Sequence, residues 1–171
     1  KYKDVLLEDF NLRKALMAKL ANAGVSEIEI ERSINSLKLI VNVSRPGMVI
    51  GRGGSGMEEI KEYLYTFLKI KKNSKAAPKI DIRIEAIKEP SLDAYLVANN
   101  ICDQLVKRLP HRRVMGQAVE KVMAANAKGV RIVLSGRVGG AEIGRTEKMQ
   151  RGTVPLSTIR EHIHFGTEPY Y

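Results

Sequence analysis

A glycine-rich basic stretch between Val49 and Met57 follows a predicted strand and opens a predicted helix. Gly51 and Gly54 frame a Gly-X-X-Gly turn within it. Because glycines carry no Cβ atom, the backbone of such a turn can approach a phosphate closely, and its N–H groups can face the anion. The stretch therefore predicts a phosphate clamp. The expected members of this clamp are Ile50, Gly51, Arg52, Gly53 and Gly54.

The same glycines also satisfy a dinucleotide-binding pattern when they are read as Gly51-X-Gly53-X-X-Gly56. A dinucleotide-binding loop leaves its strand directly, whereas seven residues separate Val43 from Gly51. Asp81 does not take the expected ribose-binding place either, because it lies in the middle of a predicted strand. The context therefore disfavours a nucleotide-binding enzyme.

A second glycine-rich stretch, Gly139 to Thr146, has the spacing of a P-loop, but Arg145 stands where the lysine is required. Lysine reaches the phosphates as a compact charge, and a helix should start at the end of the loop. Residues 147–151 are not convincingly amphipathic. These glycines are therefore expected to form tight turns between strands, with Arg137 and Arg145 projecting outward.

Three basic residues, His111, Arg112 and Arg113, occupy the first turn of a predicted helix that follows Pro110. Positive charge at a helix N-terminus opposes the macrodipole at a cost of a few tenths to ~1 kcal/mol. An external anion would offset this cost, so the triplet is a second candidate for phosphate contact. The alternative is that Pro110 only starts the helix and that the arginines are solvated.

No group of residues predicts catalysis or a metal site. His162 and His164 alternate along a predicted strand and are expected to point to one face. Cys102, the single cysteine, lies beside the apolar stripe of a predicted helix and cannot form an internal disulfide. One thiol with scattered histidines does not make a zinc site. We therefore expect no catalytic residue, no metal, no cofactor and no enzymatic activity.

The chain of 171 residues carries a formal net charge of +10, and its pI is near 9.8. A surplus of this size attracts polyanions, and both halves of the chain are positive. Together with the glycine-rich turn, it favours a nucleic-acid partner over a merely soluble basic protein. No apolar run approaches the ~18 residues that span a bilayer, and the start lacks the apolar core of a signal peptide. We therefore expect a cytoplasmic protein with no membrane contact.

Hydrophobic periodicity predicts the elements that position the clamp. A helix is expected over residues 10–23, with Asp9 and Asn11 as capping residues and Gly24 as its stop. Alternating residues predict a hairpin, and a helical turn, a longer helix, a basic loop and a third strand follow. The expected ranges are 27–31 and 37–43 for the hairpin strands, 33–36 for their turn, 46–50 for the helical turn, 57–67 for the helix, 69–78 for the loop and 80–84 for the third strand.

A change of pattern near Pro90 predicts a boundary between two domains. In the second domain, Ser91 is expected to cap a helix that Pro110 ends, and the helix with the basic triplet follows. A strand and a glycine-rich remainder, which we expect to be β, complete an α+β chain of two small domains. The expected ranges are 1–89 and 90–171 for the domains and 130–134 for the strand.

The order of a helix, two strands, a short helix, the Gly-X-X-Gly turn, a helix and a strand resembles a type II KH domain, which clamps about four nucleotides. The whole sequence resembles the bacterial ribosomal protein S-three family of the small ribosomal subunit. This resemblance covers nearly the whole chain and is most specific in the Ser-Gly-Arg to Ala-Glu-Ile block. It is carried by residues 45–47, 49–54, 133–143, 145–146 and 152–156.

The resemblance implies a KH domain, an α+β C-terminal domain and a structural role in the small ribosomal subunit. It implies binding to ribosomal RNA in the head of that subunit, beside two other ribosomal proteins. It also implies a place at the mRNA entry channel, where Arg112 and Arg113 match a pair implicated in gripping and unwinding incoming mRNA. Weaker candidates for ribosomal RNA contact, which could instead be solvated or paired with Glu142 or Glu147, are Arg131, Arg137, Arg145 and Arg151.

Two departures from the family pattern bear on these sites. Gly116 stands where bacterial relatives commonly have a lysine one helical turn after the arginine pair, which reduces the charge at the channel. Gly53 stands where the clamp often has a second basic residue. Relatives usually also start earlier and end later, so trimmed ends are expected. The alternatives are a free KH-type RNA-binding regulator and a nucleotide-binding enzyme, and the source is a bacterium or an organelle of bacterial descent.

Overall fold

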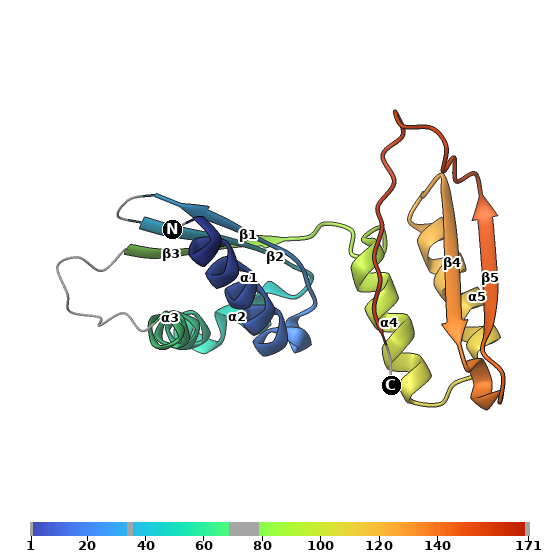
Figure 1. The fold of residues 1–171 in the computed structure, drawn as a ribbon, viewed down its shortest axis with the longest axis horizontal. Coiled ribbons are helices and arrows are strands. Elements are labelled where there is room, and N and C mark those ends of the chain that lie inside the picture. Colours follow the sequence, from blue (N-terminus) through green and yellow to red (C-terminus); the bar gives the residue numbers. More distant parts are fainter. Residues whose placement is uncertain (1, 34–35, 69–78, 170–171) are drawn as a thin grey trace. The chain divides into compact units, whose positions relative to one another are not determined.

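The computed structural model describes residues 2–33, 36–68 and 79–169, and the chain divides into two compact units. The first unit is Lys1–Lys88 and the second is Glu89–Tyr171 (Figure 1). The predicted basic loop lies outside the described residues, as does the centre of the predicted hairpin turn. None of the described helices is long and apolar enough to cross a membrane.

The first unit has the order helix, two strands, two helices and a strand, which confirms the type II KH fold that the resemblance implies. Short 3₁₀ turns follow the first helix and join the second to the third. The elements are α1 (Tyr2–Lys19), a 3₁₀ turn (Ala21–Ala23), β1 (Val25–Arg32), β2 (Ser36–Val43), α2 (Pro46–Ile50), a 3₁₀ turn (Arg52–Gly54), α3 (Ser55–Phe67) and β3 (Lys79–Ala86).

The sheet of this unit has the order β1-β2-β3, with β1 and β2 antiparallel and β2 and β3 parallel. The predicted hairpin is therefore confirmed. Alternate residues of the central strand β2 are buried, because α1 and α3 cover the same face of the sheet (Figure 1). The core joins this face to both helices and includes Leu12, Leu16, Leu39, Val41, Val43, Ile60 and Leu64.

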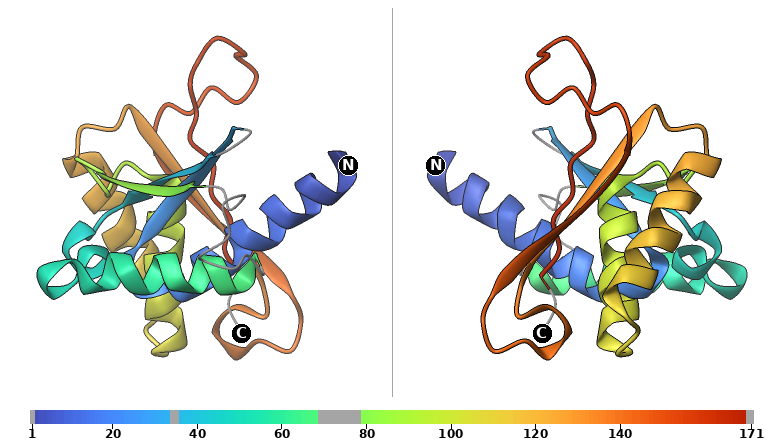
Figure 2. Two further views of the ribbon diagram at one scale, coloured as in Figure 1. Left: turned by 90° about the vertical axis from the view of Figure 1, so that its left-hand side faces the viewer. Right: turned by 90° about the vertical axis from the view of Figure 1, so that its right-hand side faces the viewer.

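The predicted start of the first helix is wrong, because α1 begins at Tyr2 and Asp9 lies inside it. Figure 2 shows its first turns projecting away from the sheet, and Leu6 and Phe10 are exposed there. Those turns bury no stripe, so periodicity could not reveal them. Asp9 caps nothing and instead accepts a hydrogen bond of 2.7 Å from Nε of Arg32 on β1. The helix ends at Lys19, and the left-handed Gly24 closes the following 3₁₀ turn.

The second unit packs two helices and a two-stranded antiparallel sheet. The helix α5 contacts both strands and α4. The core of this unit includes Ile101 and Leu105 of α4 and Val114 of α5, with Ile132 and Leu134 of the sheet against them. The elements are α4 (Ala94–Val106), α5 (His111–Ala124), β4 (Gly129–Gly136), a 3₁₀ turn (Val138–Gly140) and β5 (Arg145–Gly152).

The predicted limits of α4 are wrong at both ends. Its N-cap is Asp93, whose carboxylate accepts a hydrogen bond of 3.1 Å from the Leu96 N–H, so Ser91 lies before the helix and does not cap it. The helix stops at Val106, and Arg108 then takes a positive φ of 60°. The chain has therefore left the helix before it reaches Pro110.

The predicted β structure of the remainder is confirmed only in β5, because residues 153–169 form neither helix nor strand. This tail runs beside α4 (Figure 1), where Sγ of Cys102 donates to the Glu168 carbonyl over 3.5 Å. His162 and His164 are not on a strand, but their rings stack with centroids 5.2 Å apart. A Cβ atom on Gly166 would lie 2.6 Å from the Tyr95 nitrogen, so only glycine permits this approach.

Candidate nucleic-acid interface

The glycine-rich turn joins α2 to α3 through three left-handed residues. The N–H of Gly51 donates to the Gly47 carbonyl over 3.1 Å and closes α2. Gly51, Gly53 and Gly54 have φ values of 71°, 64° and 86°. L-residues with a Cβ atom rarely adopt this region, so the shape of the turn requires glycine.

The outer side of the turn is open. A Cβ atom on Gly53 or Gly54 would meet no atom within 4 Å, and the Arg52 side chain is exposed. Gly54 is the N-cap of α3 and has no side chain to satisfy the first N–H groups of that helix. A phosphate can therefore reach the backbone at the start of α3 with a guanidinium beside it. Ile50 is the last residue of α2 and is partly exposed.

The inner side of the turn explains Gly56, the third glycine of the dinucleotide pattern. A Cβ atom on Gly56 would collide with the Val49 carbonyl oxygen, and one on Gly51 would lie 2.9 Å from the Gly56 nitrogen. These glycines let α2 and α3 pack closely. The whole of α2 also separates β2 from the turn, and Asp81 lies within β3 opposite Lys38. The dinucleotide interpretation is therefore not supported.

The P-loop interpretation fails in the second unit for a similar reason. Gly139 and Gly140 have φ values of 69° and 79° and form a tight turn after β4, as predicted. Arg145 then begins a strand rather than a helix, so no helix N-terminus faces this turn. Nη2 of Arg145 donates to the Val138 carbonyl over 3.3 Å, and Nε of Arg137 donates to the Ala141 carbonyl over 2.9 Å.

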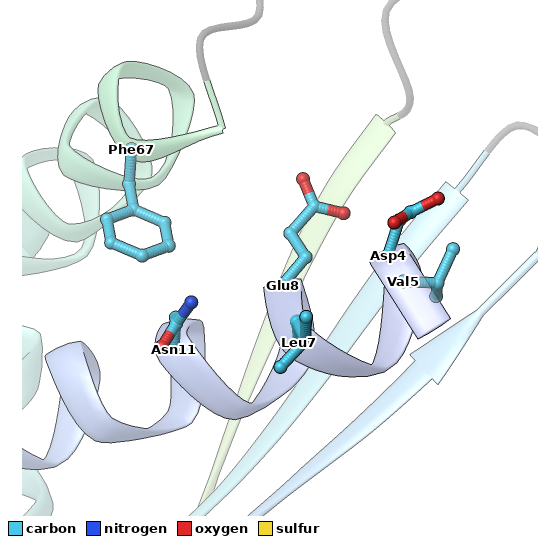
Figure 3. A pocket seen from close by; sticks show the side chains of 6 residues that line it. All are labelled: Asp4, Val5, Leu7, Glu8, Asn11 and Phe67. Carbon is cyan, nitrogen blue, oxygen red and sulfur yellow. The ribbon is translucent and has the colours of Figure 1, made fainter. Parts of the chain in front are cut away.

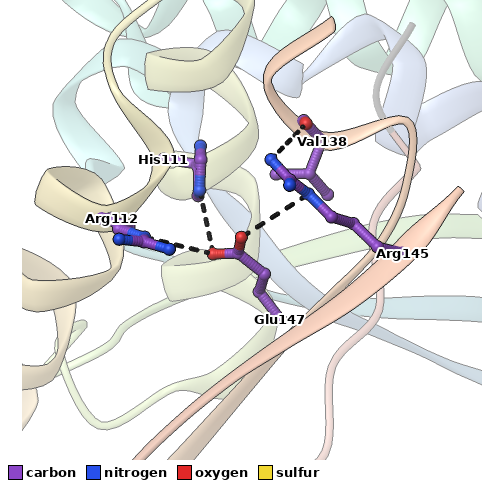
Figure 4. A network of polar contacts seen from close by, with 5 residues as sticks. All are labelled: His111, Arg112, Val138, Arg145 and Glu147. Atoms are coloured by element: carbon purple, nitrogen blue, oxygen red, sulfur yellow. Dashed lines mark hydrogen bonds and ion pairs between the residues drawn. The ribbon is translucent and has the colours of Figure 1, made fainter. Parts of the chain in front are cut away.

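The basic triplet does begin α5, but the carboxylate of Glu147 lies close to two of its three residues. Glu147 on β5 lies between the start of α5 and Arg145, and Figure 4 shows their side chains converging. Its Oε2 is 2.9 Å from Nε2 of His111 and 3.8 Å from Nε of Arg112, and its Oε1 is 3.7 Å from Nε of Arg145. His111 and Arg112 therefore also have an internal carboxylate close by, which the sequence alone did not predict.

Arg113 differs from its neighbours in the triplet. Its side chain is exposed, and it forms no ion pair within residues 2–33, 36–68 and 79–169. The Arg112 side chain is 82% exposed, so its terminal nitrogens also face solvent even though Nε approaches Glu147. Both guanidinium groups are thus accessible to a phosphate, and that of Arg113 is the less engaged.

The four weaker arginine candidates do not form one surface. Register places Arg131 of β4 opposite Gln150, on the face of the sheet that α5 does not cover. Arg145 and Arg151 of β5 point to the opposite face of the sheet, the same face as Glu147. Arg137 lies in the turn after β4. Sequence reasoning missed Lys148, which lies on the same uncovered face as Arg131, although alternation along β5 could have revealed it.

A shallow pocket lies between α1 and the end of α3 (Figure 3). The carboxylates of Asp4 and Glu8 line it together with apolar side chains that include Leu7 and Phe67. Carboxylates repel phosphate, so this pocket is a poor candidate for nucleic acid.

Two side chains of the described residues, Cys102 and Tyr95, have raised pKa values, and neither shift activates a nucleophile. Burial raises the pKa of the Cys102 thiol, and the Glu168 and Asp103 carboxylates raise it further. The same two effects, burial and then Glu168, raise the pKa of Tyr95. A raised thiol pKa disfavours the reactive thiolate. Within the described part of the chain, no group of three or more His, Cys, Asp or Glu side chains could hold a metal ion.

Comparison with known proteins assigns both units. A KH domain profile matches residues 11–92, and the profile of "Ribosomal protein S3, C-terminal domain" matches residues 101–170. A relative from Clostridium novyi (strain NT) is 41% identical over 165 residues, which are 96% of this chain and 72% of that protein. Another from Shouchella clausii (strain KSM-K16) is 43% identical over 166 residues, 97% of this chain and 72% of that protein. Both are named small ribosomal subunit protein uS3. This chain therefore belongs to the ribosomal protein S3 family.

Proposed function

We propose that this chain is a structural constituent of a bacterial-type small ribosomal subunit, where it binds ribosomal RNA and other ribosomal proteins and catalyses no reaction. The observation that carries this proposal is similarity to proteins named small ribosomal subunit protein uS3 over both units of the chain. A free KH-type regulator would need only the first unit, so the match of the second unit disfavours that alternative.

The glycine-rich turn is the proposed RNA clamp of the first unit. Its support is the open backbone at Gly53 and Gly54, the uncapped start of α3 and the exposed Arg52. These groups offer donors and positive charge to a phosphate without any contact to a base edge. The clamp therefore grips RNA by its backbone and has little sequence preference of its own.

The start of α5 is the proposed mRNA contact at the entry channel, in the head of the subunit beside other ribosomal proteins. Its support is the accessible guanidinium groups of Arg112 and Arg113, which can hold backbone phosphates while translocation pulls the strand through. Gly116 contributes no charge one turn later, which reduces the positive charge available for unwinding structured mRNA.

The experiment that tests the proposed function is co-sedimentation of the native protein with small ribosomal subunits across a salt series. Electrostatic binding that is merely adventitious falls steeply with salt. Retention of about one copy per subunit after a high-salt wash is the expected result. Release into the soluble fraction at moderate salt would instead identify a free RNA-binding protein.

A further inference from the structure

The two-stranded sheet of the second unit has one face covered and one face open. The helix α5 contacts both strands on the side that carries Ile132 and Leu134. The alternate residues point to the other side, and each of their side chains is exposed. We call this side the ribbon face. It consists of Arg131, Val133 and Ser135 of β4 and Thr146, Lys148 and Gln150 of β5.

The ribbon face is basic and rich in hydrogen-bonding groups. It holds two cations, two hydroxyls and an amide, and it has no carboxylate because Glu147 points to the side of α5. Within the described chain, neither Arg131 nor Lys148 forms an ion pair. Both charges are therefore free to meet an anion outside this unit.

The register sets the spacing of these groups. Arg131 lies opposite Gln150, Val133 opposite Lys148, and Ser135 opposite Thr146. Arg131 and Lys148 are thus diagonal neighbours, with Cα atoms about 7–8 Å apart. The hydroxyls of Ser135 and Thr146 lie 3.3 Å from each other at one end of the face. The result is a strip with Arg131 and Gln150 at one end, Lys148 in the middle and the two hydroxyls at the other end.

We propose that the ribbon face binds the sugar–phosphate backbone of a double-helical RNA segment. This inference rests on the proposed function, which supplies a folded RNA as the partner. Double-stranded RNA presents phosphates and 2′-hydroxyls across a wide, shallow minor groove, and cations with neutral donors and acceptors suit both groups. Single-stranded binders add aromatic side chains on which bases stack, and the ribbon face has none.

The proposal changes which side chains of this sheet are assigned to RNA. Arg145 and Arg151 lie on the opposite side, where Arg145 is 3.7 Å from Glu147. Lys148 takes their place, because register rather than residue type decides which charges share a surface. The proposal thus gives one chain two kinds of RNA contact, a backbone clamp at the glycine-rich turn and a duplex contact on the ribbon face.

A binding experiment on the full chain tests this assignment. The R131Q/K148Q variant is compared with a K107Q/K121Q control, which removes the same charge from exposed positions at the end of α4 and on α5. The probes are an RNA duplex of about 16 base pairs and a single strand of the same length, each titrated across a potassium chloride series. The ribbon variant should lower the salt slope for the duplex by about two, roughly one for each lost phosphate contact.

Binding of the single strand and the behaviour of the K107Q/K121Q control show whether the lower duplex slope is specific to the ribbon face. Binding of the single strand should change little in the ribbon variant, and the control should keep most of the duplex slope. Equal losses in the two variants would show a general charge effect and overturn the proposal. An unchanged duplex slope in the ribbon variant would overturn it as well.

A second measurement locates the contact in assembled subunits. A hydroxyl-radical source is tethered to a cysteine in the C102S/T146C variant, and small subunits that contain this variant are probed for RNA cleavage. Cuts on both strands of one ribosomal RNA helix are the expected result. Intact RNA, or cuts only in a neighbouring protein, would overturn the ribbon face while leaving the proposed function in place. Absence of the variant and of the native chain from the subunits would instead overturn the proposed function itself.

Discussion

Nε2 of His111 lies 2.9 Å from Oε2 of Glu147, and this contact joins the start of α5 to β5. The two side chains are only 17% and 21% exposed. Nε2 is buried and has no hydrogen-bond partner of good geometry among the described residues, so the contact is a close approach rather than an aligned hydrogen bond. Arg112 and Arg145 approach the same carboxylate, and the macrodipole of α5 adds partial positive charge there. One carboxylate thus balances several cationic groups at this junction.

Replacing that carboxylate should destabilise the second unit. Glu147→Gln leaves the basic groups of His111, Arg112 and Arg145 facing one another, and we expect the free energy of unfolding to fall by about 1–3 kcal/mol. Urea unfolding followed by circular dichroism measures the change. Glu142→Gln is the matched control, because Glu142 is exposed and has no ion pair in the described chain. Equal effects of the two substitutions would contradict a special role of Glu147.

The approach of Arg112 to Glu147 predicts that Arg112 and Arg113 do not contribute equally to mRNA contact. Replacing both Arg112 and Arg113 with alanine should leave assembly largely intact and impair translation through stable mRNA hairpins, since phosphate contacts at an entry site act on transit. Arg113→Ala alone should cause most of the defect, because Nε of Arg112 already lies 3.8 Å from Glu147. Hairpin read-through in a reconstituted translation system measures this, with Lys121→Ala on the same helix as control. Unchanged read-through in the double variant would remove the assignment.

Hydrophobic periodicity predicts those helices and strands that bury one face in the core. The alternation in β2 and the stripe of α3 mark surfaces that meet in one core, so their existence and type could be read from the sequence. The beginning of α1 could not, because its first turns expose Tyr2, Leu6 and Phe10 and bury no stripe. The cap of α4 could not be predicted for a different reason, since Ser91 and Asp93 are both good capping residues and only the backbone conformation decides between them.

The parts of the site that lie in one continuous stretch of chain could be predicted from the sequence. The parts that depend on contacts between distant residues, or on the register of two strands, could not. The glycine-rich turn is one continuous stretch, and its glycines permit the positive φ values that Gly51, Gly53 and Gly54 adopt. The contact of His111 with Glu147 joins residues that are far apart in sequence and requires the packing of α5 on β5. Likewise, only the register of β4 with β5 separates Arg131 and Lys148 from the remaining arginines.

Two glycines that flank the turn, Gly56 of α3 and Gly47 of α2, should respond differently to substitution. Gly56→Ala places a Cβ atom against the Val49 carbonyl oxygen, so overpacking between α2 and α3 should cost about 1–3 kcal/mol of stability. Gly47→Ala is the control, because Gly47 also lies in a helix, α2, and a Cβ atom there would meet no atom within 4 Å. That control should leave stability unchanged or raise it by up to about 1 kcal/mol. Urea unfolding separates the two, and a stable Gly56→Ala protein would contradict the close packing inferred here.

Negative charge at the open side of the turn should weaken the binding of single-stranded RNA without unfolding the first unit. Gly53→Asp with Gly54→Asp adds two carboxylates at positions where a Cβ meets nothing, and asparagine at the same positions is the isosteric control. Both pairs carry a similar backbone cost of about 1 kcal/mol per residue at positive φ. Repulsion of about 1 kcal/mol or more per charge should lower single-stranded RNA affinity more than about tenfold in the aspartate pair only. Equal affinities of the aspartate and asparagine pairs would exclude the turn as a phosphate clamp.

Alkylation of Cys102 should report on the docking of the tail against α4. Burial, followed by the Glu168 and Asp103 carboxylates, raises the pKa of this thiol, so the native state keeps its proton at a pH where the unfolded chain has lost it. Stability therefore falls as the pH rises from the ordinary pKa of 9.0 through the raised native value, because the native state binds more protons in that window. The iodoacetamide reaction should accelerate at a higher pH in the native protein than in urea. Glu168→Gln should move that acceleration to lower pH, whereas Glu161→Gln, farther back in the tail, should not. An identical pH profile for native protein, unfolded chain and Glu168→Gln would show that the tail does not rest on Cys102 in solution.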